Sequence, residues 1–343
     1  MKKLLTFVSA ITAGAIGTAS AEISVSGSSN FFYASGTGDA NSITNEESMS
    51  VFGGTLAFAM STETTNGITV SSSATVSAHT DSVATDTDEG PALGELAAMT
   101  FGMDGMKVTL GDINNAGSGT GGGGDVTSFA ATHVASITTT TGNAAAGADA
   151  AIDGIADGTG INVATSMGDV AVNATFVSTV GSGRNSLATD TKTTGFVSGY
   201  SVDVGFAVGD VAVNVAGGGS TSQIETTANN TAIGFEVSYP ATDAWTVSAG
   251  GSQGTLSDVE VDNMFAEAAY TMDADTTLSL GYSTKDNEDA DGVVDEERLI
   301  TVNVSRSLGG GVSIFAEYAS VDYDTAGTGS DGSSVALGTI VSF

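Results

Sequence analysis

The sequence predicts an all-β protein, a sixteen-stranded antiparallel transmembrane β-barrel with short turns at one end and long loops at the other. Three observations predict it. Apolar and polar residues alternate along nearly the whole chain after residue 21, the connections between the alternating segments are short and long by turns, and apolar residues at helical spacing are almost absent.

The alternation defines segments of strand length, each with one apolar and one polar face. In residues 300–305, read as ITVNVS, every second side chain is aliphatic and the others are polar. The same period recurs in residues 23–33, 52–60, 170–176, 211–215, 233–239 and 312–318. Such segments suit a sheet that has different surroundings on its two sides.

The connections fix the order of the strands. Seven are short, at residues 62–67, 103–105, 167–169, 208–210, 240–243, 272–275 and 308–311. Eight are long and polar, at residues 35–48, 80–94, 113–159, 180–192, 220–229, 254–260, 284–297 and 324–332. A closed barrel crosses a hydrocarbon layer with no unpaired edge, and the short-long rhythm favours it over a secreted β-helix or β-sandwich.

The N-terminus has the features of a Sec signal peptide, which would direct the chain out of the cytoplasm. Residues 1–21, MKKLLTFVSAITAGAIGTASA, combine two lysines, an apolar stretch and small residues at Ala19 and Ala21. The apolar stretch is too short for a membrane-spanning helix, so we expect cleavage after Ala21 and a barrel from residues 22–343.

The expected mature chain is strongly acidic. Without Lys2 and Lys3 it keeps six basic residues against 40 acidic ones, a formal charge of about −34. This charge excludes nucleic acid as a natural partner, and we expect the chain to attract cations. The chain contains no cysteine, so disulfide bonds play no part.

The last strand carries a family resemblance. In SSVALGTIVSF, the odd-numbered residues from Val335 to Phe343 share one face. This ending resembles the C-terminal strand of Gram-negative outer-membrane proteins, whose terminal Phe is part of the signal that the barrel-assembly machinery reads. Val341 departs from the pattern, because the family often has Tyr there. The resemblance implies the cell outer membrane as the location and that machinery as a partner.

The plan of strands and loops resembles the sixteen-stranded general diffusion porins. The local match is the hairpin MTFGMDGMKVTLGDIN (99–114), a long third loop, and the strand pair INVATSMGDVAVNATF (161–176). The resemblance implies a homotrimer of water-filled channels for the passive transport of small hydrophilic solutes and ions, with neither a reaction nor a cofactor.

The same resemblance makes residues 113–159 the constriction loop, which folds into the lumen. The candidate acids there are Asp125, Asp149, Asp153 and Asp157, and an alternative is a surface loop rich in small residues around GSGTGGGG (117–124). Porins of this family usually set Arg or Lys on the wall opposite those acids. This chain nearly lacks such residues, although Lys107 shares a face with Thr109 and is a pore-lining candidate.

Three carboxylates fall on polar faces of predicted strands. Glu236, Glu267 and Glu317 each alternate with apolar neighbours, and an ionised carboxylate facing lipid would be costly, so we expect them to face the lumen. Acids in a channel attract cations, which predicts a cation preference. Arg298 and Arg306 share the apolar parity of their strand and are expected at its two ends.

Other chemistry is poorly supported. His79 and His133 have no metal-ligand spacing, which argues against an enzyme. The stretch KDNEDADGVVDEER (285–298) partly matches a calcium loop, but Arg298 stands where the bidentate Glu belongs. Loose Ca²⁺ or Mg²⁺ binding there or at TDTDEG (85–90) would bridge the loops to anionic lipopolysaccharide. The alternative function is an exported acidic surface adhesin or coat protein without channel activity.

Overall fold

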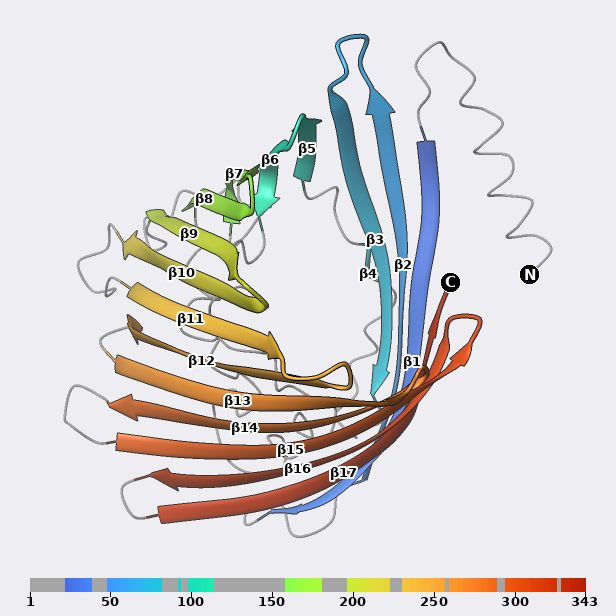
Figure 1. Ribbon diagram of the computed structural model, residues 1–343, viewed down its shortest axis with the longest axis vertical. Helices are drawn as coiled ribbons and strands as arrows, with labels where there is room; N and C mark the ends of the chain where they lie inside the picture. The colour runs from blue at the N-terminus through green and yellow to red at the C-terminus, as the bar shows by residue number, and fades with distance from the viewer. Residues whose placement is uncertain are drawn as a thin grey trace, which may run out of the picture.

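The computed structural model is built of β-strands, and it describes residues 22–38, 48–81, 92–93, 98–113, 158–180, 196–222, 230–256, 259–288, 294–325 and 328–343 (Figure 1). The strands are β1 (Glu22–Gly38), β2 (Ser48–Glu63), β3 (Thr69–Asp81), β4 (Ala92–Leu93), β5 (Ala98–Met103), β6 (Met106–Ile113), β7 (Gly158–Met167), β8 (Val170–Val180), β9 (Phe196–Val208), β10 (Val211–Ser222), β11 (Asn230–Pro240), β12 (Trp245–Leu256), β13 (Val259–Asp273), β14 (Thr276–Glu288), β15 (Val294–Gly309), β16 (Val312–Thr325) and β17 (Thr328–Ser342). No helix in these residues is long and apolar enough to span a membrane.

The sheet closes on itself, as the sequence predicts. Every strand pairing in the sheet is antiparallel, and β1 pairs with both β2 and β17. β4 and β5 both pair with β3 at different heights, so they share one position in the wall. The seventeen strands therefore occupy sixteen positions, which confirms the predicted barrel.

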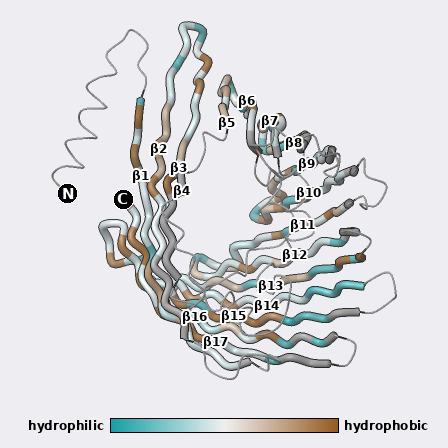
Figure 2. The backbone as a smooth tube through the Cα atoms, turned by 180° about the vertical axis from the view of Figure 1, so that it is seen from behind, coloured by the Kyte–Doolittle hydropathy of each residue, from teal (hydrophilic) through white to brown (hydrophobic). Residues whose placement is uncertain are grey.

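The two faces of the wall differ as the alternation predicts. Apolar and polar residues alternate along the chain (Figure 2). The outer face carries exposed large apolar side chains, among them Phe31, Phe176, Phe235, Tyr282, Ile300 and Leu337. The inner face carries mostly small and polar residues, including Thr175, Ser201, Asn263, Ser283 and Thr301, all of them buried. A barrel with an apolar outside and a polar inside suits a lipid environment around an aqueous lumen.

The seven predicted short turns are confirmed at one end of the barrel. In the hairpin between β5 and β6, Asp104 has φ of 27° and Gly105 has φ of 78°. Two central residues with positive φ make the type of turn whose twist matches antiparallel strands, and Asp-Gly favours this conformation. The turn chemistry of the sequence thus sets the short end of the barrel.

At the opposite end the predicted loops are partly wrong, because the strands continue into them. Residues 254–260, 284–297 and 324–332 were expected to be loops, yet β12 reaches Leu256, β13 starts at Val259, β14 reaches Glu288, β15 starts at Val294 and β17 starts at Thr328. A strand needs about 9–11 residues to cross a bilayer, and β15 has 16. Beyond the hydrocarbon both faces are wet, so the apolar alternation that marks a strand disappears.

The C-terminus closes the barrel against the first strand. Phe343 donates its backbone N–H to the Gly27 carbonyl, and Gly27 donates to the Phe343 carbonyl, each at 2.9 Å. A Cβ at Gly27 would lie 2.7 Å from Cζ of the Phe343 ring and 2.8 Å from the Thr55 carbonyl oxygen. The ring therefore lies on the outer face directly over Gly27, and the alternating C-terminal run is part of the closing seam.

Candidate functional site

The inner wall holds the three carboxylates expected there. Strand pairing sets Glu236 of β11 opposite Asn214, Glu267 of β13 opposite Ser248, and Glu317 of β16 opposite Asn303. Each lies between residues of the apolar outer face, since the neighbours Phe235 and Tyr318 are exposed there. Alternation therefore directs all three toward the lumen.

These carboxylates differ in their access to water. Glu317 is only 7% exposed, and its Oε1 accepts a hydrogen bond from Asn303 Nδ2 at 2.6 Å. Glu236 and Glu267 are half-buried. Consequently Glu236 and Glu267 are the better placed of the three to act on a passing ion.

Two lysines also belong to the inner face. Lys107 of β6 pairs with Gly102 and Ala164 and is exposed, and its place in the pore lining stays a prediction. Lys285 was expected in or beside a loop, but it lies in β14 opposite Glu297 of β15. The prediction failed for Lys285 because the acidic residues around it hide the strand period.

Several predicted residues cannot be placed. Asp125, Asp149, Asp153 and Asp157 lie outside the described residues, as do the signal peptide, most of the predicted constriction loop 113–159, TDTDEG (85–90) and His133. At the edges of that predicted loop, Ile113 ends β6 and Gly158 begins β7. His79 lies in β3, and no group of three or more His, Cys, Asp or Glu in the described part of the chain could hold a metal ion.

Sequence reasoning missed three phenylalanines on the inner face. Phe32, Phe265 and Phe315 are at most 8% exposed. A Cβ at Gly250 would lie 2.5 Å from the Phe265 ring, and one at Gly338 would lie 2.3 Å from the Phe315 ring. The rings of Phe265 and Phe315 thus lie over glycines of the neighbouring strands. Only the register reveals these pairs, because a Phe on a polar face carries no marker in a single sequence.

The described part of the outer rim carries a row of acidic residues. Strand pairing places Asp262, Asp286, Glu296 and Asp324 in one row across β13 to β16. Burial first, and then the carboxylates of Glu296 and Asp262, raise the pKa of Asp286. Arg298 relieves part of this repulsion, with Nη2 2.9 Å from Glu296 Oε2 and Nη1 3.8 Å from Asp322 Oδ2.

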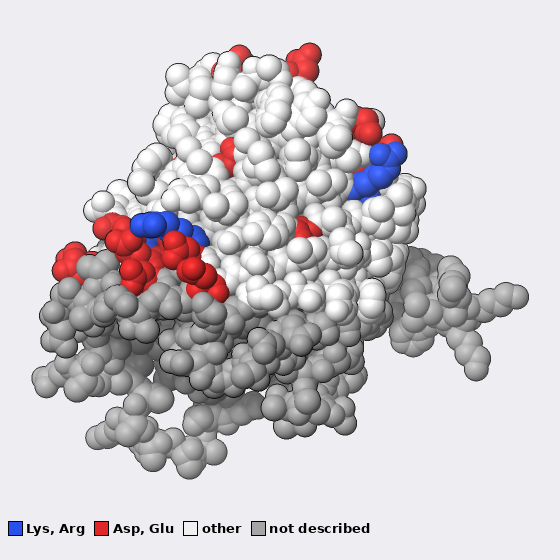
Figure 3. Space-filling model, turned by 90° about the horizontal axis from the view of Figure 1, so that it is seen from below, with Lys and Arg blue, Asp and Glu red and all other residues white. Residues whose placement is uncertain are grey.

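The charges at the two ends of the described surface frame a largely uncharged band (Figure 3). Arg298 lies near one end of β15 and Arg306 near the other, as predicted. Arg306 Nη1 lies 3.4 Å from Asp273 Oδ2. Asn287 lies in β14 and Arg298 in β15, so the stretch 285–298 does not form one continuous calcium loop. The uncharged band is the part of the wall suited to hydrocarbon.

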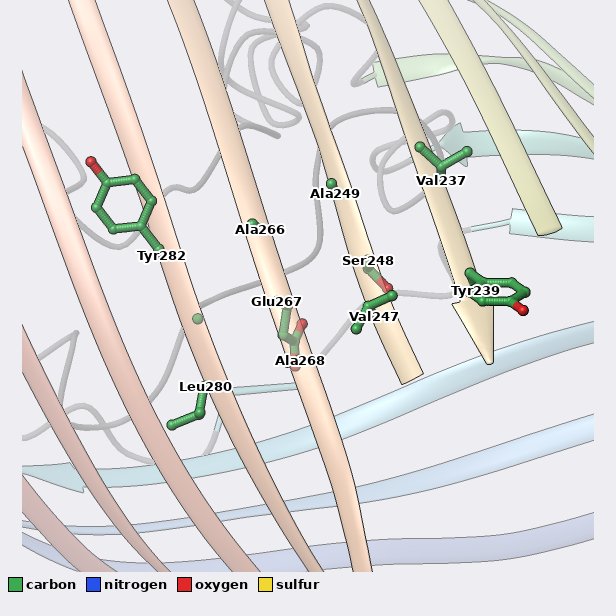
Figure 4. A pocket seen from close by; sticks show the side chains of 11 residues that line it. Val237, Tyr239, Val247, Ser248, Ala249, Ala266, Glu267, Ala268, Leu280 and Tyr282 are labelled. Atoms are coloured by element: carbon green, nitrogen blue, oxygen red, sulfur yellow. The ribbon is translucent and has the colours of Figure 1, made fainter. Parts of the chain in front are cut away.

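The outer face of β11 to β14 bears an apolar hollow of about 570 Å³ (Figure 4). Its floor contains Ala249, Ala266 and Ala268, and Tyr239 and Tyr282 stand at its sides. Near the short turns, the rings of Trp245 and Tyr270 stack with centroids 4.7 Å apart. Trp and Tyr are typical of membrane interfaces, so this end of the band marks a bilayer boundary.

The comparison with protein families decides the identity of this barrel. A model of the Gram-negative porin family matches residues 6–326. The chain belongs to the Gram-negative porin family. It is therefore a diffusion channel of the outer membrane rather than an enzyme, and membership in this porin family decides against the adhesin alternative.

Solved structures share the porin fold at low sequence identity. OmpT of Vibrio cholerae with loop L8 deleted has a TM-score of 0.64 and 13% identity, over 94% of this chain and 99% of that one. A triple mutant of the Rhodopseudomonas blastica porin has a TM-score of 0.59 and 18% identity, over 94% and 100%. The anion-selective porin of Comamonas acidovorans has a TM-score of 0.62 and 14% identity, over 94% and 100%. A search of curated protein sequences finds no match.

Glu297 makes the stability of this porin depend on pH. Its neighbours Glu296 and Arg298 are exposed and charged, so this level lies above the hydrocarbon. Burial raises the pKa of Glu297 to about 7, and the Lys285 ammonium offsets only part of that rise. The folded barrel therefore holds this proton more tightly than the unfolded chain does. The resulting stability is complete below about pH 4.5 and is lost as the pH rises to about 7.

We expect Glu297→Gln to remove this pH dependence. A rise from 4.5 to about 7 corresponds to at most roughly 3 kcal/mol. The measurement is the free energy of unfolding in denaturant at pH 5 and pH 8, for the wild-type and variant proteins. The wild type should lose more stability between the two pH values, and equal losses would contradict the prediction.

Proposed function

We propose that this porin is a cation-preferring channel for small hydrophilic solutes. The observation that carries the proposal is the charge of the inner wall. In its described part the wall presents the carboxylates of Asp203, Glu236, Glu267 and Glu317, against the lysines Lys107 and Lys285. Fixed acids along a narrow aqueous path concentrate cations and repel anions.

The fold alone does not set the sign of the selectivity. The Comamonas acidovorans porin has this fold and is anion-selective. The preference must therefore follow from the charges of each chain, and a sequence with 40 acidic and 8 basic residues supports cations. Screening by salt weakens the effect, since charges more than about 8 Å apart interact little at physiological ionic strength.

The constriction belongs to the same proposal. Residues 113–159 would fold into the lumen as the third loop, and Asp125, Asp149, Asp153 and Asp157 would supply acids at the narrowest point. Lys107 lies on the wall in β6, near the short turns and at the other end of the strand from Ile113, where this segment begins. At the narrowest point of the lumen, four carboxylates would then face a wall that carries few cationic groups.

The proposed partners follow from the family and the surface. A homotrimer is supported by the related fold of OmpT, which has been solved in a trimer form. Phe343 at the closing seam would be read by the barrel-assembly machinery. The acidic rim would meet lipopolysaccharide through loosely bound Ca²⁺ or Mg²⁺.

The test is the single-channel current of the refolded porin in a planar bilayer. The reversal potential across a KCl gradient reports the ratio of potassium to chloride permeability. We expect stepwise conductance with cation selectivity that decreases as the salt concentration rises. Anion selectivity would overturn the proposed role of the inner-wall acids.

A further inference from the structure

A polar hollow of about 670 Å³ lies on the inner wall beside the short turns of β3 to β9. Lys107, Asn173 and Asp203 line it together with Asp104 of the β5–β6 turn. It lies at the opposite ends of β6 and β7 from Ile113 and Gly158. The hollow has the size of a small-molecule site and a mixed set of charges.

Lys107 and Asp203 stand in one row across four strands. Lys107 of β6 pairs with Ala164 of β7, Ala164 with Asn173 of β8, and Asn173 with Asp203 of β9. At about 4.8 Å per strand, the Cα atoms of Lys107 and Asp203 are about 14 Å apart on the same face. Ala164 leaves the floor between them open, and the long lysine side chain can shorten the gap. A positive and a negative group thus face one hollow from its two sides.

Asp203 carries an unmet hydrogen-bonding need. The residue is only 5% exposed, and its Oδ2 has no hydrogen-bond partner among the residues that the structure describes. A buried carboxylate oxygen without a donor is costly, and proteins rarely leave one unsatisfied without a reason. On the other side, Lys107 is exposed and forms no ion pair with the other residues that the structure describes. A ligand with an ammonium and a carboxylate would satisfy both groups.

A hydrogen-bond network holds the centre of the row in place. Asn162 Nδ2 donates to Asn173 Oδ1 at 2.6 Å and to Thr175 Oγ1 at 2.7 Å. In the neighbouring strands Thr100 and Thr109 share a hydrogen bond of 3.0 Å. Such cross-links fix the side chains between Lys107 and Asp203, so the wall here is a preorganised surface.

We propose that this hollow is a weak binding site for small zwitterions such as α-amino acids. The ligand's ammonium binds Asp203, and its carboxylate binds Lys107. The inference rests on the proposed diffusion channel and names one class of solute that the channel favours. Binding beside the short turns would raise the concentration of zwitterions at the periplasmic end of the channel, from which they are released into the periplasm.

The test compares alanine with lactamide, a neutral molecule of nearly the same shape, and with the anion lactate. Uptake of each into vesicles containing the full barrel is measured against concentration. In the wild type, alanine uptake should saturate on the order of millimolar concentrations, whereas lactamide uptake should rise linearly. Asp203→Asn and Lys107→Gln should each raise the half-saturating alanine concentration at least about tenfold, because each removes one charged hydrogen-bond partner.

Asp169→Asn is the matched control, because it removes a carboxylate from the exposed β7–β8 turn at the same end of the barrel, outside the lining of the hollow. It should leave alanine saturation unchanged. Unsaturated alanine uptake in the wild type, or lactate saturating as strongly as alanine, would overturn the zwitterion site. Potassium conductance and lactamide uptake report separately on the channel, so their loss would count against the proposed function instead. Preserved conductance in Asp203→Asn and Lys107→Gln shows that both variants fold.

Discussion

Replacing Glu236 and Glu267 together with glutamine should lower the ratio of potassium to chloride permeability about two- to fivefold. One unit charge acts on an ion about 8 Å away with about 0.5 kcal/mol in water, which is close to a factor of two in local concentration. Both carboxylates lie on the inner wall and are half-buried, so each acts on the lumen at short range. The measurement is the reversal potential across a KCl gradient at about 0.1 M, where screening is moderate.

The matched control carries the same change of charge on the outside of the barrel. Asp262 and Asp286 lie in the outward-facing row at the rim, and Asp262→Asn with Asp286→Asn also removes two carboxylates. We expect this pair to change the permeability ratio by less than half as much as the inner pair. An equal effect of the two pairs would mean that selectivity arises from the field at the mouth and not from the inner wall.

The barrel was predictable from the sequence because lipid imposes alternation. Ile300, Val302 and Val304 must face hydrocarbon, so the period of two is strong wherever the wall crosses the membrane. The Asp104-Gly105 turn was equally legible, since its residue types suit its positive φ angles. The strands within the membrane and the tight turns were therefore predictable from the residue types of each short segment.

Two features were not predictable from the sequence: the strand ends that lie in water above the membrane, and the contacts that depend on the register between strands. Above the membrane, the strands around Lys285 and Glu297 lose their apolar face, so the sequence pattern there indicates loop and not strand. The row from Lys107 to Asp203 joins residues almost a hundred positions apart, and only the pairing of four strands brings them to one hollow. The polar face of each strand was predictable, whereas the neighbours of each polar residue were not.

Gly27→Ala should destabilise the barrel by about 1–3 kcal/mol, because it overfills the closing seam. The new Cβ would lie 2.8 Å from the Thr55 carbonyl oxygen and 2.7 Å from the Phe343 ring. The ring can swing away, but the backbone oxygen cannot. The measurement is the denaturant midpoint of the refolded protein in lipid vesicles, where no assembly machinery is present. Gly54→Ala is the control: its Cβ would lie 3.6 Å from its nearest neighbour, so it should be neutral or slightly stabilising.

A double-mutant cycle with Phe343→Ala separates the ring from the backbone. If the ring is the main obstacle, Gly27→Ala should cost clearly less once the ring is gone, and if the Thr55 oxygen dominates, the cost should persist. The first outcome locates the strain at the β1–β17 seam and the second at the neighbouring β1–β2 pairing, whereas a neutral Gly27→Ala in both backgrounds would contradict the packing around Gly27. The seam joins the two ends of the chain through the paired hydrogen bonds of Gly27 and Phe343. The pairing of β1 with β17 closes the barrel, and it joins strands from the two ends of the chain. No hairpin turn can bring these strands together, so the packing of the Phe343 ring over Gly27 helps to stabilise this pairing.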